Sequence, residues 1–110
     1  MNAPRILALH VTGAADSDVL DRGVRSAVNF RELDANAEVV IVVQGAVVTR
    51  LLRPATVPAL PSGTRLIACE NSLAGNDIRP EDLPPGVETT PAAVAYLARL
   101  QWAGAAYIRV

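Results

Sequence analysis

The sequence predicts an α/β protein, a three-layer α/β/α sandwich with a five-stranded parallel sheet. Short apolar runs rich in β-branched residues recur along the 110 residues and alternate with segments of helical character. Hydrophobic residues make up 51% of the chain and charged residues 19%, the balance of a compact fold. Strands that alternate with helices favour a parallel sheet, because right-handed crossovers place helices on both faces. We expect residues 1–110 to form one domain.

The first expected strand is Arg5–Val11, an apolar run with little alternation, which is typical of a strand covered on both faces. A helix is expected from Ser17 to about Leu33, where apolar residues recur at helical spacing and polar residues occupy the opposite face. Asp16, Ser17 and Asp18 would supply its N-cap and an acidic first turn.

The second expected strand is Glu38–Val43, whose β-branched residues end at the turn Gln44-Gly45. Ala46–Leu52 is expected to form a short helix. A loop should follow, because proline lacks an N–H and restricts the residue before it. The prolines that mark this loop are Pro54, Pro58 and Pro61.

The third expected strand is Thr64–Ala68, and Cys69 is the first residue beyond its carboxyl end. Asn71 or Ser72 could cap a short helix that stops at Gly75-Asn76. A proline-rich surface loop should then lead to the fourth strand. The residues that mark this loop are Pro80, Pro84, Pro85 and Gly86.

The fourth expected strand, Gly86–Thr89, is weak. Thr90-Pro91 then predicts an N-cap followed by proline in the first helical position, with the helix continuing over Ala92–Trp102 until Gly104 ends it. Ala106–Val110 is the fifth strand.

The last expected helix has an apolar surface wider than one stripe facing a sheet would need. Part of it is therefore expected to meet another subunit, with Tyr96 and Trp102 as anchors. The alternative is that its alanines are simply tolerated on an exposed surface.

The ten basic residues are all arginines and nearly balance eleven acids, so we expect neither nucleic acid nor an anionic membrane as a partner. The start of the chain, MNAPRILALHV, has one arginine and no small-residue cleavage site, so no signal peptide is expected. No apolar stretch approaches the roughly 18 residues of a membrane span. A lone cysteine forms no intrachain disulfide and fits a reducing compartment, so we expect the cytoplasm.

The sequence has no G-x-S-x-G, G-x-x-x-x-G-K-[ST] or G-x-G-x-x-G pattern, which removes the commonest hydrolase, nucleoside-triphosphate and dinucleotide interpretations. One histidine, His10, and one cysteine cannot complete a typical zinc site. We expect no cofactor and no metal.

The candidate site follows from the topology, because ligands of open parallel sheets gather beyond the carboxyl ends of the strands. The chemistry-bearing residues expected at that edge are His10, Gln44, Cys69, Asn71, Ser72 and Thr90. A thiol at the start of a helix favours the thiolate form, although the adjacent Glu70 opposes it. A cation could help, and the candidates are His10, Arg79, Arg109 or an arginine of another subunit. Arg65, at the far end of its strand, lies roughly 13 Å from Cys69 at about 3.3 Å per residue and cannot assist directly.

From the residues alone, a cysteine at a strand end is more often a small buried hydrophobe than a nucleophile. Three stretches nevertheless resemble the DsrE/DsrF-like family. They are a cysteine-x-asparagine-Ser/Thr motif in LIACENSL, a D-L-x-P-G-V segment in DLPPGV and a final R-L-Q-x-x-G-x-A-Y-I stretch in RLQWAGAAYI. The first half, with LALHV and EVVIVVQG, is similar in pattern only. The segment from Pro54 to Pro61 departs from the family, whose members tend to be helical there.

The resemblance implies a five-stranded parallel sheet, assembly into trimers or hexamers, and a sulfur-relay role. In that role Cys69 would hold sulfur as a persulfide received from a donor and handed to an acceptor protein, a sulfurtransferase-type activity. Asn71 and Ser72 would shape the helix start, and His10 or Gln44 would provide polar contacts. Two alternatives stay open. One is a non-enzymatic oligomeric protein that binds a small ligand or partner and has an inert cysteine. The other is a subunit whose active cysteine resides in a homologous partner.

Overall fold

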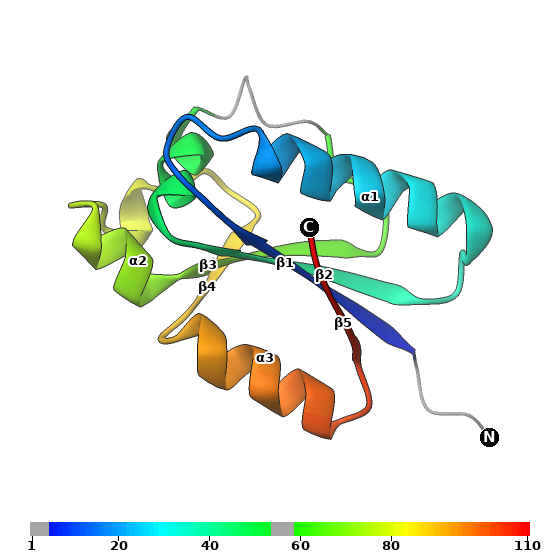
Figure 1. The fold of residues 1–110 in the computed structure, drawn as a ribbon. Helices are drawn as coiled ribbons and strands as arrows, with labels where there is room; N and C mark the ends of the chain where they lie inside the picture. Colours follow the sequence, from blue (N-terminus) through cyan, green and yellow to red (C-terminus); the bar gives the residue numbers. More distant parts are fainter. Residues whose placement is uncertain (1–4, 54–58) are drawn as a thin grey trace.

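The computed structural model describes residues 5–53 and 59–110 and contains the expected parallel sheet. Its five strands lie in the order β4-β3-β2-β1-β5, and all neighbours are parallel (Figure 1). The strands are β1 (Ile6–Thr12), β2 (Glu38–Gln44), β3 (Thr64–Cys69), β4 (Val87–Thr90) and β5 (Ala106–Arg109).

Helices cover both faces of this sheet, which confirms the three-layer α/β/α sandwich (Figure 1). α1 (Val19–Leu33) and the 3₁₀ helix η1 (Ala46–Leu52) lie on one face, and α3 (Ala93–Trp102) lies on the other. The short α2 (Glu70–Gly75) follows β3 directly, and the 3₁₀ turn η3 (Pro80–Asp82) lies in the loop before β4. Within the described residues, no helix is long and apolar enough to cross a membrane.

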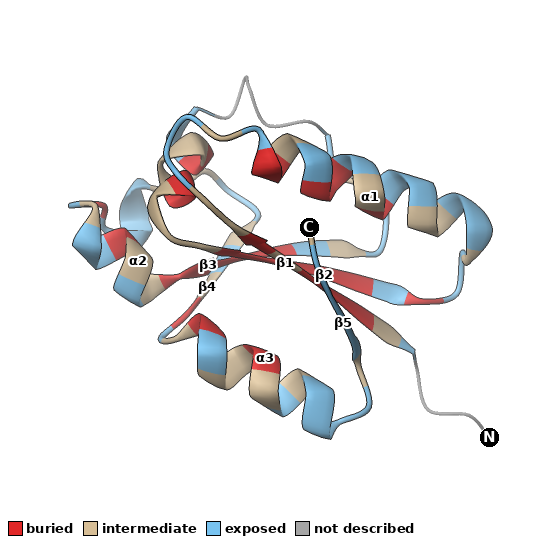
Figure 2. Cartoon of the chain, in the orientation of Figure 1, coloured by how far each residue is buried: buried red, intermediate tan, exposed pale blue. Residues whose placement is uncertain are grey.

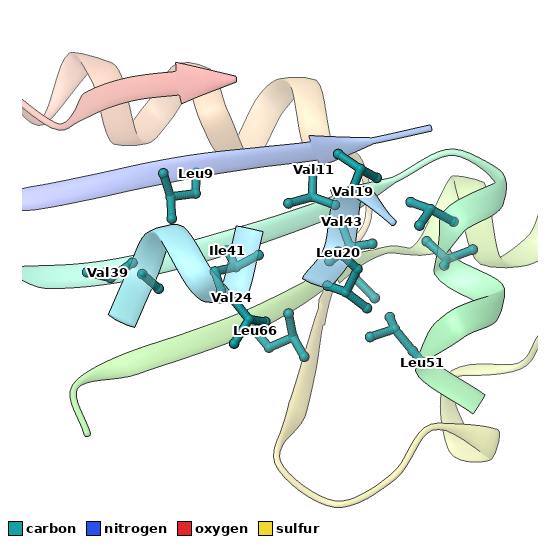
Figure 3. Packing of buried hydrophobic residues seen from close by; sticks show 14 of the residues in the cluster. Leu9, Val11, Val19, Leu20, Val24, Val39, Ile41, Val43, Leu51 and Leu66 are labelled. Atoms are coloured by element: carbon teal, nitrogen blue, oxygen red, sulfur yellow. The ribbon is translucent and has the colours of Figure 1, made fainter. Parts of the chain in front are cut away.

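The larger core lies under α1 and η1 (Figure 3). Side chains alternate between the two faces of a strand, so Leu9 and Val11 of β1 face the same side and meet Leu20 and Val24 of α1. Gly23 lets this helix approach closely, because a Cβ there would lie 2.6 Å from a methyl carbon of Val11.

The opposite face of the sheet carries the smaller core, formed with α3. Its buried members are Ala8, Val40, Val42, Ile67, Cys69, Ala93 and Leu97. Cys69 therefore lies on the α3 side of the sheet. Burial is deepest in the central strands, whereas every residue of β5 is exposed (Figure 2).

The structure corrects several expected helix starts. Ser17 supplies the hydroxyl at the start of α1, where its Oγ accepts the Val19 N–H at 3.1 Å, while the N-cap residue Asp18 makes no side-chain cap bond. The N-cap of α3 is Ala92 rather than Thr90, because Thr90 remains paired in β4. Such starts depend on how far the preceding strand is paired, which local sequence does not determine.

α2 begins at Glu70, so Asn71 and Ser72 lie inside its first turn instead of capping it. Cys69 is its N-cap residue and also the last residue of β3. The strand is therefore one residue longer at this end than the expected Thr64–Ala68. The helix expected at Ala46–Leu52 is a 3₁₀ helix. In the following loop, Pro61 begins a turn in which its carbonyl accepts the Thr64 N–H, while Pro54 and Pro58 lie outside the described residues.

Candidate functional site

The carboxyl edge of the sheet presents several of the expected site residues on the α3 face. Parallel pairing places Thr12 beside Gln44 and Cys69 beside Thr90. Because Cys69 faces α3, period-two alternation assigns Thr90, Gln44 and His10 to the same face of their strands. The topology thus brings His10, Gln44, Cys69 and Thr90 to one side of one edge.

The Cys69 thiol is almost completely shielded from solvent, with 2% of the residue exposed. The backbone at this position is extended (φ −76°, ψ 118°) where β3 passes into α2. The N–H of Ala93, the first residue of α3, donates to Cys69 Sγ at 3.4 Å. The start of a helix 24 positions later in the chain therefore meets the sulfur.

Hydrogen bonds lower the pKa of this thiol although it is buried. Burial is the largest single influence and raises the pKa of Cys69, because it disfavours the charged form. It is outweighed by hydrogen bonds from the backbone N–H of Ser72, the N–H of Ala93, the Ser72 hydroxyl and the N–H of Asn71, which together hold the pKa below its ordinary value. The cysteine combines burial with a stabilised thiolate, two properties that usually oppose each other.

Ser72 connects the thiol to the neighbouring strand. Its Oγ accepts the Gly45 N–H at 2.8 Å, which leaves its own proton to point at the sulfur of Cys69. Gly45 adopts a positive φ of 81° after β2, a conformation that glycine takes at low cost. Asn71 takes part through its backbone, and its residue is exposed.

The acidic neighbour of Cys69 is engaged elsewhere. Glu70 accepts a hydrogen bond from the Thr89 hydroxyl at 2.7 Å, which ties its carboxylate to β4. Thr90, next to Cys69 in the sheet, is 7% exposed.

His10 forms the centre of a second polar group. Its Nε2 lies 2.8 Å from Gln44 Oε1, and its Nδ1 lies 2.6 Å from the Tyr107 hydroxyl oxygen. With the Gln44 oxygen as acceptor, Nε2 carries a proton, and Nδ1 faces the Tyr107 hydroxyl. Tyr107 was not expected from the sequence, although the alternation in Ala106–Val110 places it beside Ala8 on the α3 face.

The arginines considered as partners of Cys69 have other neighbours in the structure. Arg109 pairs in register with His10 on β5. Arg79 pairs instead with Asp82, at 3.2 Å, in the exposed loop before β4. Arg65 pairs with Glu88 at 2.8 Å. The groups that lower the pKa of Cys69 are thus hydrogen-bond donors at helix starts rather than these side-chain cations.

A surface groove of about 350 Å³ opens beside this second group. It is lined by His10, Gln44, Val94, Leu97, Ala98, Gln101 and Tyr107. Across residues 5–53 and 59–110, no three His, Cys, Asp or Glu side chains gather as a metal site would require.

Two solved structures share this fold. The MTH1491 protein of unknown function from Methanobacterium thermoautotrophicum aligns with a TM-score of 0.67 and 23% identity, over 98% of this chain and all of its own. The ychN protein from E. coli aligns with a TM-score of 0.74 and 21% identity over the same shares. No family model and no curated protein matches the sequence. The likeness to these two structures shows a shared fold, and the five-stranded parallel sheet agrees with the fold that the sequence resemblance implies.

Proposed function

We propose that this protein is a sulfur carrier of the DsrE/DsrF-like type, which holds sulfane sulfur on Cys69 as a persulfide and passes it to a partner protein. The observation that supports this most is the Ala93 N–H, which donates to Cys69 Sγ at 3.4 Å and, together with donors of Asn71 and Ser72, lowers the pKa of the thiol. Thiolate is the nucleophilic form of cysteine. The cysteine-x-asparagine-serine motif and the shared fold are in keeping with this role.

The chemistry needs one cysteine and no redox cofactor. With thiosulfate as donor, the Cys69 thiolate attacks the sulfane sulfur, a Cys69 S–S bond forms, and sulfite leaves with the electron pair of the broken S–S bond. An acceptor thiolate then attacks the outer sulfur of the persulfide, and Cys69 leaves as thiolate. The donors that stabilise the Cys69 thiolate assist the second step, because a thiol of lower pKa is the better leaving group.

The proposal includes self-association through the end of α3 and the outer side of β5, in a cytoplasmic setting where the thiol stays reduced. Large apolar side chains are exposed there outside the groove beside His10, with Trp102 at 83% and Ile108 at 52%. Exposed large apolar side chains favour protein contacts. A trimer or hexamer formed through this surface would match the family resemblance.

A second candidate function is supported by the burial of the thiol. At 2% exposure, Cys69 packs as a small apolar residue among Val42 and Ile67. In that case the protein would be a non-enzymatic oligomer that binds a small ligand or partner, and Cys69 would be inert.

Intact mass separates the two functions. Reduced wild-type protein and Cys69→Ser would be incubated with thiosulfate or polysulfide, desalted and weighed under non-reducing conditions. The carrier proposal expects a gain of one sulfur in the wild type alone, removed by reductant. No gain, with a thiol that resists alkylation at neutral pH, would favour the inert cysteine.

A further inference from the structure

We propose that the groove between α3 and β5 is the entrance for a small anionic sulfane donor, and that the Leu97 side chain closes the last step between this groove and the Cys69 sulfur. The inference rests on the proposed function and adds its donor class and its route of access.

Leu97 contacts both the groove and the buried cluster around Cys69. It lines the groove and is also a buried member of the cluster that contains Cys69, with 5% of the residue exposed. Ala93, which donates to Cys69 Sγ, lies four positions earlier in α3. Residues four apart share one face of a helix, so Leu97 follows directly after the contact with sulfur on the helix face that covers the sheet.

The pairing of the strands also places the groove next to Cys69. Val43 is in register with Ala68, so the next position brings Gln44 alongside Cys69 on the adjacent strand. Adjacent strands are about 4.8 Å apart, and both side chains face α3. Gln44 lines the groove. The groove therefore ends one strand away from the sulfur, and Leu97 is the residue that both lines the groove and packs in the cluster of Cys69.

The size and burial of the site select a small donor. A groove of about 350 Å³ lies at the small end of ligand pockets. Since Cys69 is 2% exposed, the donor must be small enough to pass the position of the Leu97 side chain.

The residues that line the groove favour an anionic donor. The lining contains no carboxylate, and its polar side chains are Gln101 and the hydrogen-bonded group of His10, Gln44 and Tyr107. Arg109 stands in register with His10 at the same edge and adds positive charge. Thiosulfate and small persulfides share the required chemistry, an anion with a terminal sulfane sulfur.

The test measures access and sulfur loading separately. Access is the rate of Cys69 alkylation by iodoacetamide at neutral pH, followed by intact mass. Ala98→Trp fills the groove from the half-buried surface of α3, and Leu97→Ala removes the barrier. Leu20→Ala is the matched control, because it truncates another buried leucine, in the core on the other face.

We expect alkylation to accelerate roughly tenfold or more in Leu97→Ala and to slow several-fold in Ala98→Trp, since local opening governs the reactivity of a buried group. Leu20→Ala should stay near wild type. An equal acceleration in Leu20→Ala would mean that global unfolding exposes the thiol and would overturn the proposal. Unchanged rates in both groove variants would overturn it too.

Thiosulfate loading, measured on the same variants, distinguishes the two proposals. If loading occurs and is equal in wild type and Ala98→Trp, the entrance is refuted while the carrier function stands. If alkylation responds as expected but no variant gains sulfur, the carrier function is refuted and the route of access stands. Loading from a protein persulfide but not from thiosulfate would overturn the small-donor assignment. Size measurement of each variant confirms that the assembly is unchanged.

Discussion

Ser72→Ala tests the hydrogen-bond account of the Cys69 thiol. The Ser72 hydroxyl has two partners, since it accepts the Gly45 N–H at 2.8 Å and donates to the sulfur of Cys69. Its removal should weaken the fold and the thiolate together.

The effect on stability follows from the Gly45 N–H. This donor lies in a half-buried turn and loses its acceptor in the variant. Such losses cost about 1 kcal/mol where water can partly replace the partner, and up to about 3 kcal/mol where it cannot. We expect the free energy of unfolding to fall by about 1 kcal/mol. The pKa of Cys69 should rise, because one of its donors is gone, while the N–H groups of Asn71, Ser72 and Ala93 remain.

Two measurements follow these effects. Urea unfolding gives the stability, and the ultraviolet absorbance of the thiolate, titrated against Cys69→Ser, gives the pKa. Ser17→Ala is the matched control, because the Ser17 hydroxyl accepts the Val19 N–H at the start of α1, on the face of the sheet opposite to Cys69. It should lose a similar stability of about 1 kcal/mol and leave the pKa of Cys69 unchanged. Ser72→Thr keeps the hydroxyl and should restore the pKa. A wild-type pKa in Ser72→Ala would refute the role assigned to this side chain.

Three further predictions concern the pH dependence of stability, the packing of α1 and the assembly of the protein. Because the folded state holds the pKa of Cys69 below its ordinary value of 9.0, the free energy of unfolding should rise with pH between the lowered pKa and 9.0; denaturant unfolding at several pH values should show this rise in the wild type and lose it in Cys69→Ser. Gly23→Ala should cost about 1 to 3 kcal/mol in thermal or urea unfolding, since its Cβ would lie 2.6 Å from Val11, and a neutral result would mean that α1 shifts freely. Trp102→Glu should lower the assembly state seen by light scattering, because Trp102 is 83% exposed; an unchanged size would exclude this residue from the interface.

The strands could be predicted from sequence because their signal is local. The run EVVIVV in β2 has five successive buried residues, and a strand covered on both faces needs such a run. The position of the candidate site could be predicted as well, because the parallel topology gathers His10, Gln44 and Cys69 at one edge of the sheet.

The hydrogen bonds of the site could not be predicted in this way. The bond from Ala93 to Cys69 depends on where α3 begins, and Thr90 stays in β4 instead of capping the helix. Tyr107 joins His10 because an exposed edge strand crosses beside β1, a long-range pairing with a weak local signal. The sequence also favoured a cation near the thiol, whereas N–H groups from two helix starts occupy that role.

The most direct test of the sulfur-carrier account is the amount of transferable sulfur on the chain. After exposure to thiosulfate and removal of excess donor, cyanide attacks the outer sulfur of a persulfide and releases it as thiocyanate, leaving the cysteine thiolate. The account predicts thiocyanate equimolar with the wild-type chain and none from Cys69→Ser. No thiocyanate from the wild type, or equal amounts from both proteins, would contradict it.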